Sequence, residues 1–222
     1  MAVSQSEAVL ARGVGASGVR VVRDAYLGEA VGPSPTKSGR GTSSPHGSVV
    51  CASGRLSYAR HPEAFVRLAQ RLTDARNDVK CVWIGGGELQ PLMEEMILDL
   101  GLTGKLEVTG WLPHKDALRR LAEADILVHY SRWDSIPNSV LEAMAHGLPV
   151  IASDIPGNRG LVAAGENGLL AATEIELLEK TLQLIDDPKL AARMGAKGRA
   201  MVKAEYSRER LIAELSELYG WS

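Results

Sequence analysis

Short apolar runs alternate with amphipathic stretches along most of the 222-residue chain. The apolar runs predict six short strands, at residues 49–53, 79–84, 106–109, 126–130, 149–153 and 168–171. Between these runs apolar residues recur at helical spacing, as Phe65, Leu68 and Leu72 do after the first predicted strand. Strands that alternate with helices in this way predict an α/β fold, a Rossmann-like and doubly wound, mainly parallel sheet with C-terminal helices.

The ends of the chain differ from this pattern. Residues 32–48 are mostly Gly, Pro, Ser and Thr, which cannot bury enough apolar surface to offset the entropy lost on ordering. We therefore expect a flexible linker at 32–48, between an N-terminal segment (1–31) and a compact domain (49–222). Within the N-terminal segment, residues 19–22 form a short β-like run.

The stretch from Tyr130 to Asn158 carries the most information, because it predicts strand, loop, helix and strand, a crossover unit of a parallel sheet. Its loop contains an acid, Asp134, and a possible helix N-cap, Ser135, while Pro137 fits the first helical turn. Free amides at a helix start, beside a carboxylate, suit a ligand that carries both phosphate and sugar hydroxyls.

Composition excludes several classes of function. The chain is 45% hydrophobic, its formal net charge is -2, and its Lys and Arg residues are dispersed, so neither a nucleic-acid surface nor a polybasic membrane patch is indicated. Cys51 and Cys81 lie in apolar runs, which fits buried thiols and a reducing cytoplasm. We find no signal-peptide pattern and no apolar run long enough to span a bilayer, so any membrane association is expected to be peripheral.

Two arginines follow the first predicted strand. Arg55 and Arg60 lie five residues apart in a loop that begins with glycine, and two guanidinium groups there could clamp a diphosphate. The alternative is that both are solvent-exposed surface residues. Their position directly after a strand favours the diphosphate-binding interpretation, because ligands of such sheets bind beyond the carboxyl ends of the strands.

Two other loop features favour a structural interpretation. The triple glycine at 85–87 lacks the full dinucleotide fingerprint, and any turn between strand and helix can use glycine. Trp111 follows the third predicted strand, where we expect it to pack rather than to stack on a base. The backbone of its loop can instead contact a base.

Asp134 and Glu142 lie eight residues apart, which is a little over two helical turns. If the loop approximates the first turn, both carboxylates can face the crevice and accept hydrogen bonds from sugar hydroxyls. A lone exposed helical glutamate would be the simpler interpretation of Glu142. Its neighbours Leu141, Ala143 and Met144 are apolar, however, so its charge needs a partner.

The sequence motifs do not support a hydrolase or an NTPase. The five histidines show no metal-ligand spacing, and we predict neither a metal site nor a cofactor. The sequence contains no Gly-x-Ser-x-Gly elbow and no Walker loop.

Residues 134–152, DSIPNSVLEAMAHGLPVIA, resemble the signature EGLPNxxxEAMAxGxPVxA of the retaining glycosyltransferases of family 4, which have the GT-B fold. Three further segments are similar to that family: Gly-Arg-Leu at 54–56, Gly-Trp-Leu at 110–112 and Gly-Glu-Asn-Gly-Leu-Leu at 165–170. The resemblance covers about residues 49–219.

The resemblance implies a role for each matched residue. Arg55 and Arg60 would hold the diphosphate of the donor, and the backbone near Leu112 would contact its nucleobase. Asp134, the catalytic residue, would hold the transferred sugar, and Glu142 the ribose. Phosphate and sugar would be bound by the loop Ser135, Ile136, Pro137, Asn138 and Ser139. At position 134 the family usually has glutamate where this chain has aspartate, and at position 60 it usually has lysine where this chain has arginine. Both differences keep the charge of the side chain but change its length and geometry.

The resemblance also implies what surrounds this domain. A GT-B enzyme places its active site between two Rossmann-like domains, and residues 1–31 resemble only the end of the first, acceptor-binding one. We therefore expect the donor half of a metal-independent hexosyltransferase of polysaccharide biosynthesis, which needs an acceptor domain in cis or in trans. Two alternatives stay open: a non-catalytic nucleotide-sugar-binding subunit with a separate acceptor-domain partner, and a sugar-nucleotide epimerase.

Overall fold

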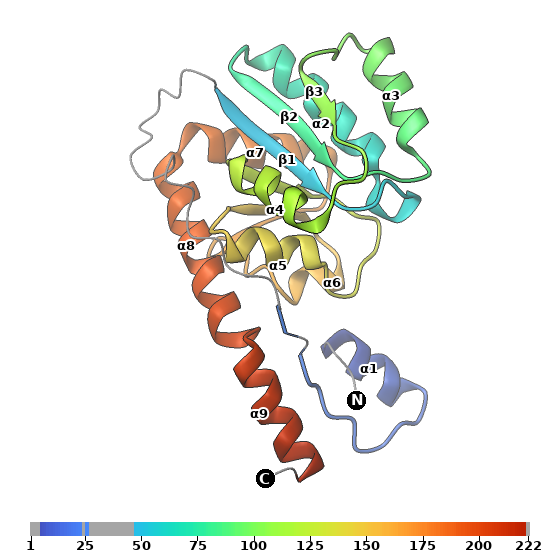
Figure 1. Ribbon diagram of the computed structural model, residues 1–222, viewed down its shortest axis with the longest axis vertical. Helices are drawn as coiled ribbons and strands as arrows, with labels where there is room; N and C mark the ends of the chain where they lie inside the picture. Colours follow the sequence, from blue (N-terminus) through green and yellow to red (C-terminus); the bar gives the residue numbers. More distant parts are fainter. Residues whose placement is uncertain (1–4, 24, 27–46, 221–222) are drawn as a thin grey trace.

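The computed structural model describes residues 5–23, 25, 26 and 47–220 of the chain (Figure 1). In this part of the chain six strands form one sheet in the order β3-β2-β1-β4-β5-β6, and each neighbouring pair is parallel. The strands are β1 (Ser48–Ser53), β2 (Val79–Ile84), β3 (Leu106–Val108), β4 (Ile126–His129), β5 (Val150–Ser153) and β6 (Gly168–Ala171). The predicted Rossmann-like parallel sheet is confirmed.

Helices cover both faces of the sheet, while α1 and α9 lie apart from it (Figure 1). The described helices are α1 (Gln5–Gly13), the 3₁₀ helix η1 (Tyr58–Arg60), α2 (Pro62–Ala75), α3 (Gln90–Asp99), α4 (His114–Glu123), α5 (Asn138–Ala145), α6 (Pro156–Arg159), α7 (Glu174–Asp186), α8 (Pro188–Glu205) and α9 (Arg208–Tyr219). One buried cluster joins α2, α3 and α7 to the sheet, and a second joins α4, α5 and the end of α8 to its other face. The sheet is therefore doubly wound, as predicted.

The strands form where they do because both of their faces are buried. Every residue of β4 and of β5 is buried, so these strands are continuous apolar runs except at their last positions. On one face Phe65 of α2 packs edge-on against Trp83 of β2, with ring centroids 5.6 Å apart. Each large side chain buried in this way contributes roughly 1.5 to 3 kcal/mol.

The order of strands reverses beside β1. This strand pairs with β2 on one side and with β4 on the other, with Val50 opposite Ile126. The chain leaves β1 towards α2 on one face and leaves β4 towards α5 on the opposite face. The loops after β1 and β4 therefore part at the carboxyl edge of the sheet, the position at which such folds bind ligands.

All six predicted strands are confirmed, with ends within one residue of the prediction. The start of α5 is a correction. Its N-cap is Pro137, with no capping side chain, so Ser135 is not the cap and Pro137 is not in the first turn. Residues 19–22 form no strand of the sheet, and the sequence did not predict α6.

The N-terminal segment runs beside the last helices (Figure 1). The backbone N–H of Tyr26 donates to the carbonyl oxygen of Tyr206 at 2.8 Å, and Arg20 pairs with Glu217 at 2.6 Å. The predicted linker, 32–48, lies outside the described residues except at its end, where Ser48 already belongs to β1. None of the helices that the structure describes is long and apolar enough to cross a membrane.

Helix α8 approaches the turn between α5 and β5 so closely that only glycine fits. A Cβ atom on Gly195 would lie 2.0 Å from the carbonyl oxygen of Gly147, whereas one on Gly198 would lie 3.0 Å from Cγ of Met144 and 3.6 Å from the carbonyl oxygen of Asn167. Replacing a solvent-exposed helical glycine by alanine usually stabilises the helix by roughly 1 kcal/mol. At Gly195 the same substitution should be destabilising, because the new Cβ atom would overlap with backbone atoms.

We therefore expect Gly195→Ala to lower the free energy of unfolding by roughly 1 to 3 kcal/mol, measured by urea denaturation. Gly198→Ala is the matched control, and it should cost less, because its nearest contact is a side-chain carbon at 3.0 Å rather than a backbone oxygen at 2.0 Å. Equal stability of the parent and Gly195→Ala would show that α8 does not approach the turn in this way.

Candidate functional site

The loops after β1 and β2 are held together by close backbone contacts. A Cβ atom on Gly85, at φ +135°, would lie 2.2 Å from the carbonyl oxygen of Gly54. One on Gly87 would lie 2.4 Å from that of Leu56, whose N–H donates to the carbonyl oxygen of Gly86 at 2.9 Å. The glycines at 85–87 therefore permit packing of backbone against backbone, which is the structural role predicted for them.

The loop between β4 and α5 is supported from two sides. The N–H of Arg132 donates to the carbonyl oxygen of Ala59 at 2.9 Å, which joins this loop to η1. On the other side a Cβ atom on Gly157 of α6 would lie 2.2 Å from the carbonyl oxygen of Asp134. The backbone that carries Asp134 is therefore fixed by segments after β1 and after β5.

Arg60 is directed to the same place by a sharp turn. His61 follows it with φ +50° and ψ +53°, a left-handed conformation that ends η1 and begins α2. The side chain of Arg60 passes over Gly54, with its Nε 3.7 Å from the position of a Cβ on that glycine. Its guanidinium group thus lies at the carboxyl end of β1.

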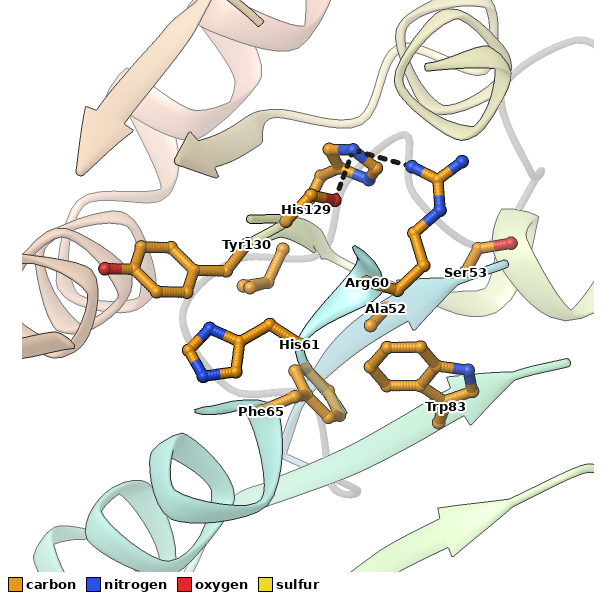
Figure 2. Close-up of a pocket in the computed structure, with 10 residues that line it drawn as sticks. Ala52, Ser53, Arg60, His61, Phe65, Trp83, His129 and Tyr130 are labelled. Atoms are coloured by element: carbon orange, nitrogen blue, oxygen red, sulfur yellow. Dashed lines mark hydrogen bonds between the residues drawn. The ribbon is translucent and has the colours of Figure 1, made fainter. Parts of the chain in front are cut away.

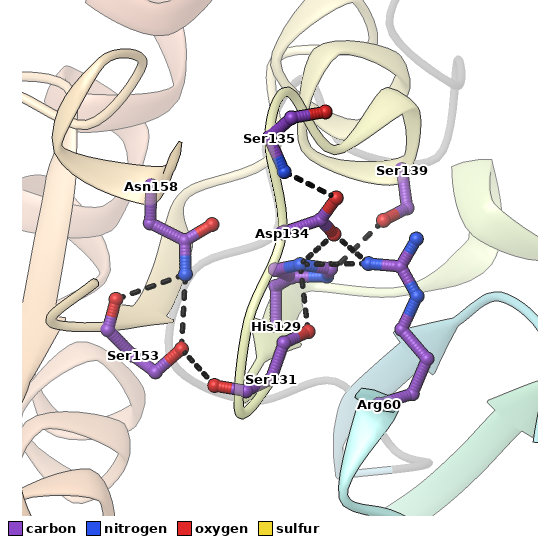
Figure 3. Close-up of polar contacts among 8 residues, drawn as sticks. All are labelled: Arg60, His129, Ser131, Asp134, Ser135, Ser139, Ser153 and Asn158. Carbon is purple, nitrogen blue, oxygen red and sulfur yellow. Dashed lines mark hydrogen bonds and ion pairs between the residues drawn. The ribbon is translucent and has the colours of Figure 1, made fainter. Parts of the chain in front are cut away.

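Arg60, His129 and Asp134 form one polar network (Figure 3). Nη1 of Arg60 donates to Oδ2 of Asp134, and Nε2 of His129 lies 3.2 Å from the same oxygen. Oδ1 of Asp134 accepts from the N–H of Ser135 at 3.0 Å. Because the Asp134 side chain is only 13% exposed, these contacts replace most of its hydration.

The imidazole of His129 is buried within this network. Oγ of Ser131 lies 3.0 Å from its Nε2, and Oγ of Ser139 lies 3.2 Å from its Nδ1. Burial, followed by the nearby positive charge of Arg60, lowers the pKa of His129 to about 3. The ring is therefore neutral at physiological pH. Burial also lowers the pKa of Arg60, whose guanidinium remains protonated.

A small pocket lies beside this network, between the ends of β1 and β4 (Figure 2). Arg60 and His129 face one another at one side of it, with Nη1 and Nε2 3.2 Å apart. Phe65 and Trp83 form its apolar side, and His61 stacks on Tyr130 with ring centroids 5.9 Å apart. The pocket therefore combines a cation with aromatic walls at the position where the strand order reverses.

The structure places the other predicted residues around this centre. Arg55 pairs with Glu88 at 2.9 Å, and its side chain is 66% exposed. Glu142 is 18% exposed and contacts Nε2 of His114 at 3.0 Å, so it has the partner that its apolar neighbours require. Leu112 packs on the buried cluster beneath α4 and α5. Within the binding loop Ser139 contacts His129, Ser135 contacts Asp134, and Ser135 and Asn138 are exposed; Ile136 is half-buried and Pro137 is buried.

Trp111 packs at the surface. The residue is 69% exposed, so the predicted packing takes place on the outside of the domain. Its ring and backbone N lie 3.0 Å from the position of a Cβ on Gly86, so it covers the glycine loop from outside.

His129 is the site residue that the sequence did not predict. It ends an apolar strand, and its contact Arg60 is 69 residues away in the chain. Only its position, at the end of a strand beside the acid-bearing loop, could have signalled it. Within the described ranges no group of three or more His, Cys, Asp and Glu side chains is placed to hold a metal ion; the expectation of no metal and no cofactor stays a prediction.

Burial of neutral His129 predicts a specific acid sensitivity. The unfolded chain binds a proton at His129 near the ordinary pKa of 6.5, whereas the folded chain does so only near pH 3. The unfolded state therefore binds more protons in this window, and stability falls as pH falls from 6.5 towards 3. Between pH 7 and pH 4.5 this residue should remove roughly 2 kcal/mol from the free energy of unfolding.

Urea denaturation of the parent and of His129→Gln across that range tests this. The free energy of unfolding should fall less steeply for His129→Gln, because glutamine does not titrate. Parallel curves for the two proteins would contradict the assignment of a buried neutral ring.

Comparison of the sequence with known proteins identifies the family to which the chain belongs. Residues 37–201 match the family model described as Glycosyl transferases group 1. The chain is 26% identical over 173 residues to alpha-D-kanosaminyltransferase of Streptomyces kanamyceticus, covering 77% of this chain and 45% of the relative. It is 28% identical over 178 residues to the GDP-mannose-dependent monoacylated alpha-(1-6)-phosphatidylinositol monomannoside mannosyltransferase of Corynebacterium glutamicum, covering 77% and 46%.

A solved structure is similar in fold. Anabaena Alr3699/HepE in complex with UDP-glucose superposes with a TM-score of 0.84 and 20% identity, over 99% of this chain and 62% of that chain. The likeness bears on the fold alone. The chain spans about half the length of the two relatives above. Since the family model covers most of its residues, the chain belongs to the family of group 1 glycosyl transferases.

Proposed function

We propose that the chain is the donor-binding half of a retaining, metal-independent glycosyltransferase of family 4, which transfers a hexose from a nucleotide diphosphate sugar. One observation carries the proposal. Arg60 and Asp134, which follow the adjacent strands β1 and β4, meet beside the uncapped N-terminus of α5. A cation, an acid and free helix amides at one edge of the sheet suit a ligand with phosphates and hydroxyls.

The diphosphate is assigned to Arg55, Arg60 and the start of α5. The ion pair of Arg55 with Glu88 is exposed at both ends, and such pairs contribute about 0 to 1 kcal/mol. A phosphate can therefore draw Arg55 away at small cost. Arg60 is 27% exposed, and its second guanidinium nitrogen is open to a further acceptor while Nη1 contacts Asp134.

The sugar is assigned to Asp134 and the ribose to Glu142. Each carboxylate oxygen has two lone pairs, so Asp134 retains acceptor capacity after its contacts with Arg60, His129 and Ser135. Glu142 has its contact with His114 at one oxygen, Oε1. Hydroxyl groups of a donor can occupy the remaining positions.

The chemistry would be electrostatic. As the bond between sugar and diphosphate breaks, negative charge grows on the departing diphosphate. Arg55, Arg60 and the α5 amides stabilise that charge from fixed positions, so little reorganisation is needed as the reaction proceeds. The retaining outcome rests on the resemblance of residues 134–152 to the family signature.

The base and the acceptor are open within this proposal. The Corynebacterium relative is named as GDP-mannose-dependent, and Alr3699/HepE is bound to UDP-glucose. Leu112 and exposed Trp111 lie where the backbone would contact the base. The acceptor is assigned to an additional domain, because the chain spans about half of its relatives. If that domain is a separate protein, the chain is a nucleotide-sugar-binding subunit instead.

Calorimetric titration with UDP and GDP tests the diphosphate assignment. We expect one of the two to bind, and Arg60→Ala and Arg55→Ala to weaken it about ten-fold or more, which is the effect of losing a charged hydrogen bond. Arg119→Ala is the matched control. This arginine is 64% exposed and ion-paired on α4, and its loss should leave the affinity unchanged. Binding of neither nucleotide, or unchanged affinity in Arg55→Ala and Arg60→Ala, would refute the assignment.

Chelation tests the metal-independent part of the proposal. Because arginines would supply the positive charge, EDTA should leave nucleotide affinity within about two-fold, and added Mg²⁺ or Mn²⁺ should not raise it further. A loss of binding in EDTA that Mn²⁺ restores would instead place a cation between the protein and the diphosphate.

A further inference from the structure

His129 has no part in the proposed donor contacts, yet it is almost fully enclosed within the site. Its side chain is 3% exposed at the end of β4, and both ring nitrogens have polar neighbours. Nε2 lies 3.0 Å from Oγ of Ser131 and 3.2 Å from both Asp134 and Arg60, while Nδ1 faces Ser139 (Figure 3). An interior position of this kind requires every polar atom of the ring to be satisfied.

The neighbours determine which nitrogen carries the proton. A carboxylate only accepts hydrogen bonds, so a lone pair on Nε2 would face the negative oxygen of Asp134 across 3.2 Å in a poorly solvated place. A proton on Nε2 turns this repulsion into a hydrogen bond. Nδ1 then accepts from the hydroxyl group of Ser139, which can rotate to donate. Arg60 satisfies its own Nη1 through Asp134, and the hydroxyl oxygen of Ser131, 3.0 Å from Nε2, can accept from the Nε2–H as well.

We propose that His129 is a positioning residue: its Nε2–H holds the Asp134 carboxylate in place for the sugar of the donor, while Arg60 also contacts the diphosphate. The inference rests on the proposed function, because it assigns His129 to the same site. Without His129, Oδ2 of the carboxylate would be held only by Arg60, on whose guanidinium group the diphosphate also draws. The backbone N–H of Ser135 contacts the other oxygen.

A neutral donor suits this task better than a second cation. The low pKa of His129 keeps its ring uncharged, so it directs the carboxylate without neutralising it. The full negative charge of Asp134 therefore stays available to sugar hydroxyl groups and to Arg60. A lysine or a protonated histidine here would compete with Arg60 for Asp134.

The tautomer can be measured without any ligand. In a long-range ¹H–¹⁵N correlation spectrum of the parent chain at pH 7, the signals of His129 are those that disappear in His129→Gln. We expect a protonated Nε2 and an unprotonated Nδ1. A proton on Nδ1, or a doubly protonated ring, would overturn the proposal, because Nε2 would then either lack a hydrogen or carry a charge.

Two substitutions separate the hydrogen bond from the packing of the ring. Glutamine places an amide near the position of Nε2 and can donate to Asp134, whereas asparagine reaches only the position of Nδ1. Both remove the ring, so each is the control for the other. The measured quantity is the affinity for UDP-glucose relative to UDP, and for GDP-mannose relative to GDP, which isolates the contribution of the sugar.

We expect His129→Gln to keep this ratio close to that of the parent and His129→Asn to reduce the affinity for the nucleotide sugar about ten-fold, with the affinity for the free nucleotide changed far less. Equal ratios in both variants would overturn the positioning role while leaving the donor site intact. If the parent binds no nucleotide, the proposed function fails and the sugar-holding role fails with it, and the spectrum still decides whether His129 donates to Asp134.

Discussion

The Asp134 carboxylate is the group on which the rest of the site depends. A carboxylate that leaves water loses hydration worth several kcal/mol unless charges and hydrogen bonds replace it. Arg60 supplies the charge, and His129 and the backbone of Ser135 supply the hydrogen bonds. Because Arg60 follows β1 while His129 ends β4, the carboxylate joins the two strands at which the sheet reverses its order. A ligand that draws on Arg60 therefore changes how this carboxylate is held.

The frame around this carboxylate is rigid because backbone packs on backbone. Gly157 contacts the carbonyl group of Asp134, and buried Asn158 donates to the carbonyl oxygen of Ser153 at 2.9 Å. Oγ of Ser153 in turn donates to the carbonyl oxygen of Ser131 at 2.7 Å (Figure 3). The short helix α6 thus supports the loop after β4 through the side chains of Asn158 and Ser153. Fixed dipoles and charges of this kind would suit the electrostatic mechanism proposed above, since they would not have to be reorganised during the reaction.

The sequence predicted most of the fold because strands of a parallel sheet are buried on both faces and stand out as apolar runs. It failed at α5, where Ser135 and Pro137 have strong local preferences for a helix start. The chain instead uses the N–H of Ser135 for Asp134, and the helix begins at Asn138. Side-chain partners were harder to predict. His129 ends an apolar run like any other, and its role follows only from the pairing of β4 with β1.

That pairing also bears on the two departures from the family pattern. Arginine at position 60 and aspartate at position 134 each change the reach of a charge when considered alone. In the folded chain they contact each other, so the shorter carboxylate faces a planar group with donors on several nitrogens. A lysine at position 60 would present a single ammonium group, and its charge could not be shared between Asp134 and a phosphate on separate nitrogens. The two departures therefore fall on residues that contact each other, and in the proposed donor site they would together determine how positive charge is divided between Asp134 and a phosphate.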